Sequence, residues 1–196
     1  MADELSRALS FCELVASYFN SATTCSYELV ELCAGNGNVG SIFSLQENIR
    51  GIVFVDIRKG RGLDHTTKNM RKPFEVYLDG ITGYQPKKNQ AIVAVHACGT
   101  LTDKVLETAS ENCCLVGVMP CCYDQETRVK LEKVALSLPN FERRKMLYGS
   151  IEDYYDSIRT ALLIGKGYNA YLTQIDKKIT PMNNVIVGIP LKRQQE

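Results

Sequence analysis

The sequence predicts an α/β fold with a mostly parallel, doubly wound sheet. Apolar strand-like runs alternate with helical stripes along most of the chain. Early in the chain, a strand is followed by a glycine turn, a helix, a second strand and an acidic residue, which is the order of one half of a Rossmann-like fold. The last two strand-like runs are separated by a short link, so we expect them to form an antiparallel hairpin.

Each element follows from hydrophobic periodicity. Apolar residues at helical spacing between Asp3 and Phe19 predict a helix, with Asp3 as its N-cap, that flanks the sheet within residues 1–20. Apolar runs then predict strands at 27–33, 51–56, 74–78, 91–95, 115–119, 168–175 and 184–189. Further helices are expected from Val39 and over 104–112, 125–138 and 151–164, with a short strand near 145–148. Thr102 and Asp103 are predicted to cap the helix that follows them.

The glycine turn after the first strand indicates the class of ligand. Gly35 and Gly37 let the backbone turn sharply and approach a ligand with no Cβ in the way. With Gly40 they satisfy the G-x-G-x-x-G spacing of dinucleotide sites, and Asp56 at the tip of the second strand can accept hydrogen bonds from both ribose hydroxyls. Glu31 aims a carboxylate at the pocket mouth, where it repels a pyrophosphate and attracts an ammonium or sulfonium group. The sequence therefore favours S-adenosylmethionine over a dinucleotide.

The turn resembles motif I of the class I S-adenosylmethionine-dependent methyltransferases, acid-x-G-x-G-x-G, with Cys33 in place of the first glycine. The resemblance implies a Rossmann-like class I methyltransferase with a mostly parallel seven-stranded sheet, helices on both faces and a carboxyl-terminal antiparallel hairpin. The cofactor-binding residues that it implies are Glu31, Cys33, Ala34, Gly35, Asn36, Gly37, Asp56, Ile57, Asp79, Gly80 and His96. Glu31, Gly35 and Gly37 are expected to face the methionine moiety. Asp79 is placed to accept from the adenine amino group, and it is equally a common turn residue before a glycine.

Unusual residues follow the fourth and fifth strands, and ligands of an open parallel sheet lie at such carboxyl ends. The string His96-Ala97-Cys98-Gly99-Thr100-Leu101-Thr102-Asp103 and the string Pro120-Cys121-Cys122-Tyr123 resemble the H-x-C-G-x-x-T-D and P-C-C-aromatic strings of one methyltransferase branch. That branch has relatives among tRNA 2′-O-methyltransferases. Thr180-Pro181-Met182-Asn183 is similar to its terminal T-P-K-N string, with Met182 in place of the lysine, so a contact made by that lysine is not implied here.

The candidate catalytic residues are His96, Cys98, Cys121, Cys122 and Tyr123. His96 is the best candidate base because its unperturbed pKa lies near neutrality, although its ring could equally close a hydrogen bond between strand tips. Cys121 and Cys122 could supply a thiolate that adds to a pyrimidine ring before C5 methylation. At least one of them is instead expected to pack behind the cofactor, because neighbours on an extended segment point to opposite sides. The Asp/Asn-Pro-Pro-aromatic string of base amino methyltransferases is missing after the fourth strand, so adenine N6 or glutamine methylation is not expected.

Metal binding by the same strand tips is the other chemistry to weigh. His96, Cys98, Cys121 and Cys122 are ligand types of zinc. They stand on separate strand tips, and the chain has no C-x-x-C pair, so we expect no metal site. The eight cysteines are expected to be reduced and to act mostly as small buried hydrophobes.

Length and charge limit the remaining functions. A chain of 196 residues suits one core, so we expect a single methyltransferase domain over residues 1–196. The first residues do not form a signal peptide and no apolar run approaches the ~20 residues of a membrane span, which predicts a cytoplasmic protein without a membrane partner. The net charge of +1 supplies no global attraction for nucleic acid.

RNA, and tRNA in particular, is nevertheless the leading acceptor, because the predicted loop from Arg58 to Lys72 is basic and the branch has tRNA-modifying relatives. A small molecule or a protein side chain is an alternative acceptor. The alternative from another class is a non-catalytic adaptor with a methyltransferase fold that binds a protein partner. The methyl acceptor and the oligomeric state are not specified by the sequence.

Overall fold

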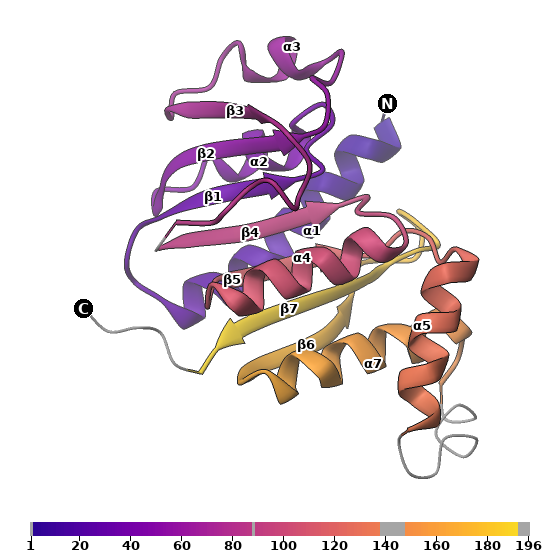
Figure 1. Cartoon of the computed structure of the whole chain (residues 1–196). Coiled ribbons are helices and arrows are strands. Elements are labelled where there is room, and N and C mark those ends of the chain that lie inside the picture. Colours follow the sequence, from indigo (N-terminus) through magenta and orange to yellow (C-terminus); the bar gives the residue numbers. More distant parts are fainter. Residues whose placement is uncertain (1, 88, 138–147, 192–196) are drawn as a thin grey trace.

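The computed structural model describes residues 2–87, 89–137 and 148–191. These residues form one seven-stranded sheet with helices on both faces (Figure 1). Its strands are β1 Tyr27–Leu32, β2 Ile49–Asp56, β3 Phe74–Leu78, β4 Gln90–Val95, β5 Leu115–Met119, β6 Tyr168–Gln174 and β7 Asn184–Pro190. The described helices are α1 Ala2–Ala22, α2 Asn38–Phe43, α3 Leu63–Thr67, α4 Thr100–Glu111, α5 Gln125–Leu136 and α7 Ile151–Gly165.

The strand order is β3-β2-β1-β4-β5-β7-β6. Strands β1 to β5 run parallel to one another, whereas β7 runs antiparallel to both β5 and β6. This arrangement confirms the predicted class I methyltransferase fold with its closing hairpin. Strands β1 and β4 are neighbours, but the chain leads from β1 to β2 in one direction along the sheet and from β4 to β5 in the other. A topological switch point therefore lies between β1 and β4.

The central strands β1, β4 and β5 are buried on both faces, which explains why they are almost continuously apolar. Leu29 of β1 belongs to the cluster under α1 and α2, together with Phe11 and Val15. The next residue, Val30, faces the opposite cluster, which includes Val105 of α4. Helix α1 thus covers one face of the sheet and α4 covers the other (Figure 1).

The structure differs from the sequence prediction in one additional helix and in the starting residues of two others. Residues 63–67 of the basic stretch form the short helix α3, where a loop was expected. Helix α4 begins at Thr100 after Gly99, so Thr102 and Asp103 lie inside the helix and are not caps. Helix α1 begins at Ala2, which places the predicted cap Asp3 within it. The short strand expected near 145–148 lies almost wholly outside the described residues.

Tertiary contacts explain why Thr102 and Asp103 lie inside α4 and do not cap it. The hydroxyl of Thr102 donates to the carbonyl of Ala97, and Asp103 accepts from Nε of the buried Arg159 at 2.8 Å. Both polar side chains therefore have partners outside the helix terminus. None of the described helices is both long enough and apolar enough to cross a lipid bilayer.

Candidate cofactor pocket and active site

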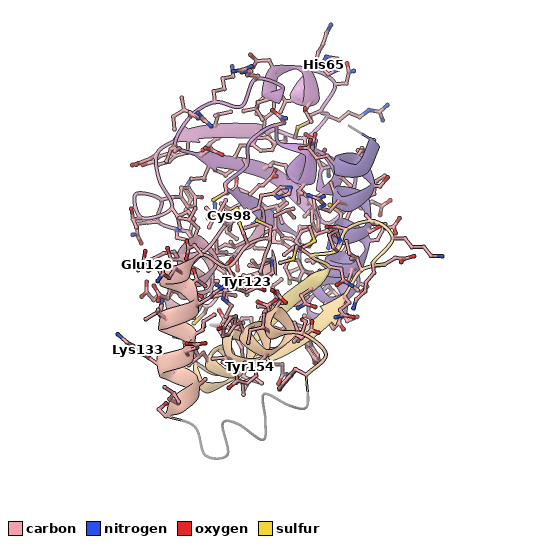
Figure 2. The ribbon with its side chains drawn as sticks, turned by 90° about the vertical axis from the view of Figure 1, so that its right-hand side faces the viewer. His65, Cys98, Tyr123, Glu126, Lys133 and Tyr154 are labelled. Carbon is pink, nitrogen blue, oxygen red and sulfur yellow. The ribbon has the colours of Figure 1, made fainter. Side chains whose placement is uncertain are left out.

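A cavity of about 660 Å³ opens at the carboxyl ends of β1, β2 and β4, at the topological switch point. These strand ends point to the right in Figure 1 and toward the viewer in Figure 2. The cavity is lined by Glu4, Ala8, Glu31, Cys33, Ala34, Gly35, Asn36, Asn38, Val39, Asp56, Ile57, Arg58, Lys59, Gly60, Arg61, Val95 and His96. Most of the cofactor residues expected from the sequence are among them.

The turn between β1 and α2 has the left-handed backbone that its glycines permit. Gly35 and Gly37 have φ angles of 52° and 71°, and Cys33, where motif I has a glycine, has a φ of 57°. A Cβ on Gly37 would lie 2.5 Å from Leu63 Cδ1, so Gly37 is needed for packing and does not line the cavity. A Cβ on Gly60 would lie 1.8 Å from the carbonyl oxygen of Gly35, which shows how closely the two loops approach.

Glu31 lines the cavity and is buried. Its Oε2 accepts from the backbone N–H of Gly40 at 2.7 Å, so the carboxyl group satisfies an amide in the first turn of α2. Burial raises the pKa of Glu31 to about 8, although hydrogen bonds from Gly40 and Val39 act in the opposite direction. A cation placed against this carboxyl group would favour its ionised form.

Asp56 lines the cavity from the end of β2. Its Oδ2 accepts from the backbone N–H of Gly35 at 2.9 Å, and its Oδ1 accepts from that of Arg58 at 3.3 Å. These bonds fix the carboxylate between the two loops. Each oxygen keeps a lone pair that can accept from a hydroxyl of a ligand.

Asp79 and Gly80 lie outside the cavity lining, in an exposed turn after β3. Asp79 Oδ1 accepts from the backbone N–H of Gly80 at 2.7 Å, and a Cβ on Gly83 would lie 2.1 Å from Asp79 Oδ2. These contacts are those of a turn aspartate.

His96 lines the cavity at the end of β4 and has a φ of 72°, in the left-handed region. Nη1 of Arg7 is 3.2 Å from His96 Nε2. Because a guanidinium group can only donate, Nε2 accepts and the ring proton is on Nδ1. Burial lowers the pKa of His96, and the charge of Arg7 lowers it further. The ring is therefore neutral near pH 7, as a general base must be.

Helix α1 brings two further side chains to the cavity, Glu4 and Ala8. Oε1 of Glu4 accepts from Asn38 Nδ2 at 2.9 Å, and Arg7 contacts His96. The helix thereby connects the turn after β1 with the tip of β4 along one side of the cavity.

The three cysteines among the candidate catalytic residues lie together but outside the cavity lining. Cys98 and Cys122 are exposed and Cys121 is half-buried. Burial raises the pKa of Cys121, the neighbouring thiols raise it further, and burial also raises the pKa of Cys98. Both groups are thiols at neutral pH, which does not favour addition of a thiolate to a pyrimidine. Cys121 and Cys122 do not point to opposite sides, because the chain has left β5 before it reaches them.

Tyr123 is buried and belongs to a network that joins α4, α7 and the loop after β5. Its hydroxyl donates to Asp156 Oδ2, and the guanidinium group of Arg159 lies 5.3 Å from its ring centroid. Arg159 also bonds Asp103 and Asp156, at 2.8 and 3.2 Å. Burial raises the pKa of Tyr123, so its hydroxyl stays protonated as a donor. Met182 packs against the same cluster.

Several residues of the cavity were not predicted from the sequence. Asn38, Val39, Lys59 and Gly60 line it, as does α1 through Glu4. Gly60 and Gly62 within a basic stretch were the available signal, since closely spaced glycines mark a close approach of the backbone. The partner of that approach is the turn at Gly35, which only the tertiary structure reveals.

The residues present fit a cofactor with a cationic end and a ribose. The volume lies in the range of small-molecule sites, and Glu31 and Asp56 place two carboxyl groups at separate positions of its wall. The model of a methyltransferase-domain family (Methyltransf_32) matches residues 3–128. The chain belongs to this family. Its cofactor is accordingly S-adenosylmethionine, and the protein is an S-adenosylmethionine-dependent methyltransferase.

Solved methyltransferases are similar in fold. The methyltransferase domain of a bacterial protein, CtHen1-C, has 15% sequence identity and a TM-score of 0.59 over 95% of this chain and 98% of that one. An rRNA methylase from Streptococcus thermophilus has 16% identity and a TM-score of 0.52 over 94% of each chain. Magnesium protoporphyrin IX methyltransferase from Synechocystis PCC 6803, solved with bound SAH, has 8% identity and a TM-score of 0.58 over 93% of this chain and 83% of that one. No curated protein sequence matches the chain significantly.

Proposed function

We propose that this methyltransferase acts on RNA and that the chain works as a single domain. The observation that carries the proposal is the basic rim of the cofactor cavity. Arg58, Lys59 and Arg61 all line the cavity from the loop after β2. A net charge of +1 gives no general attraction for a polyanion, so a cluster of basic side chains beside the methyl donor is the feature that would hold phosphates.

The names of similar structures support the same class of acceptor. They include an rRNA methylase from Streptococcus thermophilus and the 23S rRNA methyltransferase ErmE, which matches over 92% of this chain with 14% identity and a TM-score of 0.53. Lys59 is paired with Asp64 at 2.6 Å on the surface. Arg58 and Arg61 are therefore the better candidates for direct phosphate contacts.

The cofactor roles follow from the geometry of the cavity. Glu31 and the turn at Gly35 would hold the methionine end, and the Asp56 carboxylate would accept from the ribose hydroxyls. When bound, the cofactor supplies an electrophilic methyl group on a sulfonium. The chain's own residues must then position the acceptor and remove its proton.

His96 is the proposed base. It stands at the wall of the cavity, is neutral, and has a left-handed backbone of the kind that clusters at functional sites. Its Nε2 accepts from Arg7, so the role of base requires Arg7 to release this nitrogen when the acceptor arrives. Cys98, Cys121, Cys122 and Tyr123 lie outside the cavity lining, so the proposed catalytic role rests on His96.

Salt-dependent binding of total cellular RNA tests the proposal. We expect wild-type protein to retain RNA at low salt, and Arg58→Glu and Arg61→Glu each to weaken retention and lower the salt slope by about one unit. Lys133→Glu, on the exposed surface of α5, is the matched control and should retain RNA like wild type. No retention by the wild-type protein at low salt, or equal loss in the control, would contradict an RNA acceptor. Mass spectrometry of RNA from cells with and without the gene then identifies the methylated nucleoside.

A further inference from the structure

Three cysteine side chains converge beside the cofactor cavity. Cys98 follows β4, and Cys121 and Cys122 follow β5. The Sγ atoms of all three lie within 4.8 Å of one another. The Cys98 and Cys121 sulfur atoms are 2.8 Å apart, and those of Cys121 and Cys122 are 3.5 Å apart.

The backbone around the three thiols holds the two loops together. The N–H of Gly99 donates to the carbonyl of Cys122 at 3.2 Å, which ties the residue after Cys98 directly to the second loop. Gly99 has a φ of 60°, and a Cβ there would lie 2.3 Å from Asp124 Oδ2. The close approach of the loops is therefore built into the backbone and does not depend on the cysteine side chains.

We propose that Cys98, Cys121 and Cys122 bind a Zn²⁺ ion as three thiolates. Zinc prefers tetrahedral sulfur sites with Zn–S distances of ~2.3 Å, which place the sulfur atoms about 3.8 Å apart. The observed sulfur positions span this separation. Cys98 and Cys121 must separate by roughly 1 Å to reach it, and the side chain of Cys98 is exposed.

The fourth position of the ion is open to solvent. Among the described residues, no other histidine, cysteine or carboxylate joins the group, and two of the three thiols are exposed. Three protein ligands and an exchangeable fourth one are typical of catalytic zinc sites. Cys98 is two residues from His96, which lines the cofactor cavity, so the ion would lie beside the reaction site.

The convergence of three sulfur atoms favours a metal over a disulfide. A bond between Cys98 and Cys121 would use two thiols and leave the position of Cys122 without a role. The separate strand tips led the sequence analysis to expect no metal site. The structure shows that both tips reach one point, which spacing along the chain could not show.

Metal analysis of the whole protein tests the site. The protein is purified under reducing conditions, stripped with a chelator, equilibrated with Zn²⁺ alone, freed of excess ion and analysed by inductively coupled plasma mass spectrometry. We expect one zinc ion per chain, released by a thiol-modifying reagent. Replacement of Zn²⁺ by Co²⁺ should give near-ultraviolet thiolate-to-cobalt charge transfer and the intense visible bands of a tetrahedral site.

Serine variants assign the ligands. Cys98→Ser, Cys121→Ser and Cys122→Ser should each lower zinc affinity by more than about 100-fold, whereas Cys25→Ser, at an exposed cysteine outside the cluster, should bind like wild type. Circular dichroism identifies any variant that fails to fold, and the cobalt spectrum of the wild-type protein decides the question without variants. Substoichiometric zinc with no charge-transfer band, whether the thiols stay reduced or form a disulfide, would overturn the proposal. So would a zinc ion that remains in all three variants.

Discussion

At the scale of single residues, two carboxyl groups with different surroundings line the candidate cofactor cavity. Glu31 is buried against the amides of α2, whereas Asp56 is held between two loops at the cavity wall. The sequence predicted both positions, because each acid stands at the carboxyl end of an apolar strand. It could not predict the burial of Glu31, which depends on α1 and α2 closing over it.

Burial of Glu31 makes stability depend on pH. Its folded pKa is raised to about 8 from an ordinary value of 4.5, so in between the folded state keeps a proton that the unfolded state has lost. The contribution of Glu31 to the free energy of unfolding is therefore most favourable below pH 4.5. It falls as the pH rises from 4.5 toward 8, and it is constant above pH 8. Glu31→Gln removes the dependence.

Urea unfolding of both proteins at pH 5.5 and 8.5 measures this effect. We expect wild type to lose on the order of 3 kcal/mol relative to the Glu31→Gln variant over this interval. The comparison cancels the titration of groups common to both proteins. A difference between the two proteins that does not change with pH would contradict the assigned burial of a neutral carboxyl group.

His96 carries the proposed proton transfer. His96→Ala should lower kcat by about 100- to 10,000-fold and lower cofactor affinity far less. His65→Ala is the matched control, because His65 lies on α3 outside the cavity lining and should leave kcat unchanged. Single-turnover kinetics and cofactor titration separate the two effects. A normal kcat, or a loss explained entirely by weaker cofactor binding, would remove His96 from the catalytic role.

At the scale of elements, apolar runs predicted every strand of the sheet within about two residues. The signal is strongest for β1, β2, β4, β5 and β7, because strands buried on both faces are almost continuously apolar. Helix α3 was missed, since its five residues include a histidine and two threonines and carry no helical stripe. The meeting of Cys98 with Cys121 was missed for another reason. It depends on irregular backbone after two strands, for which periodicity gives no information.

Helix α1 packs closely on the sheet at a glycine of β5. Gly117 of β5 lies under Val15, and a Cβ there would come within 2.6 Å of Val15 Cγ1. Gly117→Ala should therefore destabilise the protein by about 1–3 kcal/mol. Val15→Ala in the same chain should recover part of this loss because it removes the clashing methyl groups.

A double-mutant cycle by urea unfolding measures this coupling. An interaction energy near zero, with Gly117→Ala and Val15→Ala simply additive, would contradict the close packing of α1 on β5.

At the scale of the whole molecule, the methyltransferase sheet brings the ends of β1, β2 and β4 to one cavity, and α1 closes one side of it. The fold class and most of the pocket could be predicted because the strand, turn and acid lie close together in the sequence. The contributions of Glu4 and Gly60 to the cavity could not be predicted, because these residues belong to segments that meet the turn only in the folded chain.

The most direct test of the account is calorimetric titration of the protein with S-adenosylmethionine. Wild type should bind one cofactor per chain, and Asp56→Ala should abolish binding while circular dichroism shows an intact fold. Asp176→Ala, at a carboxylate that accepts from the backbone N–H of Lys178 in its own turn, should bind like wild type. Undiminished affinity in the Asp56→Ala variant would contradict the cavity at the ends of β1 and β2 as the cofactor site.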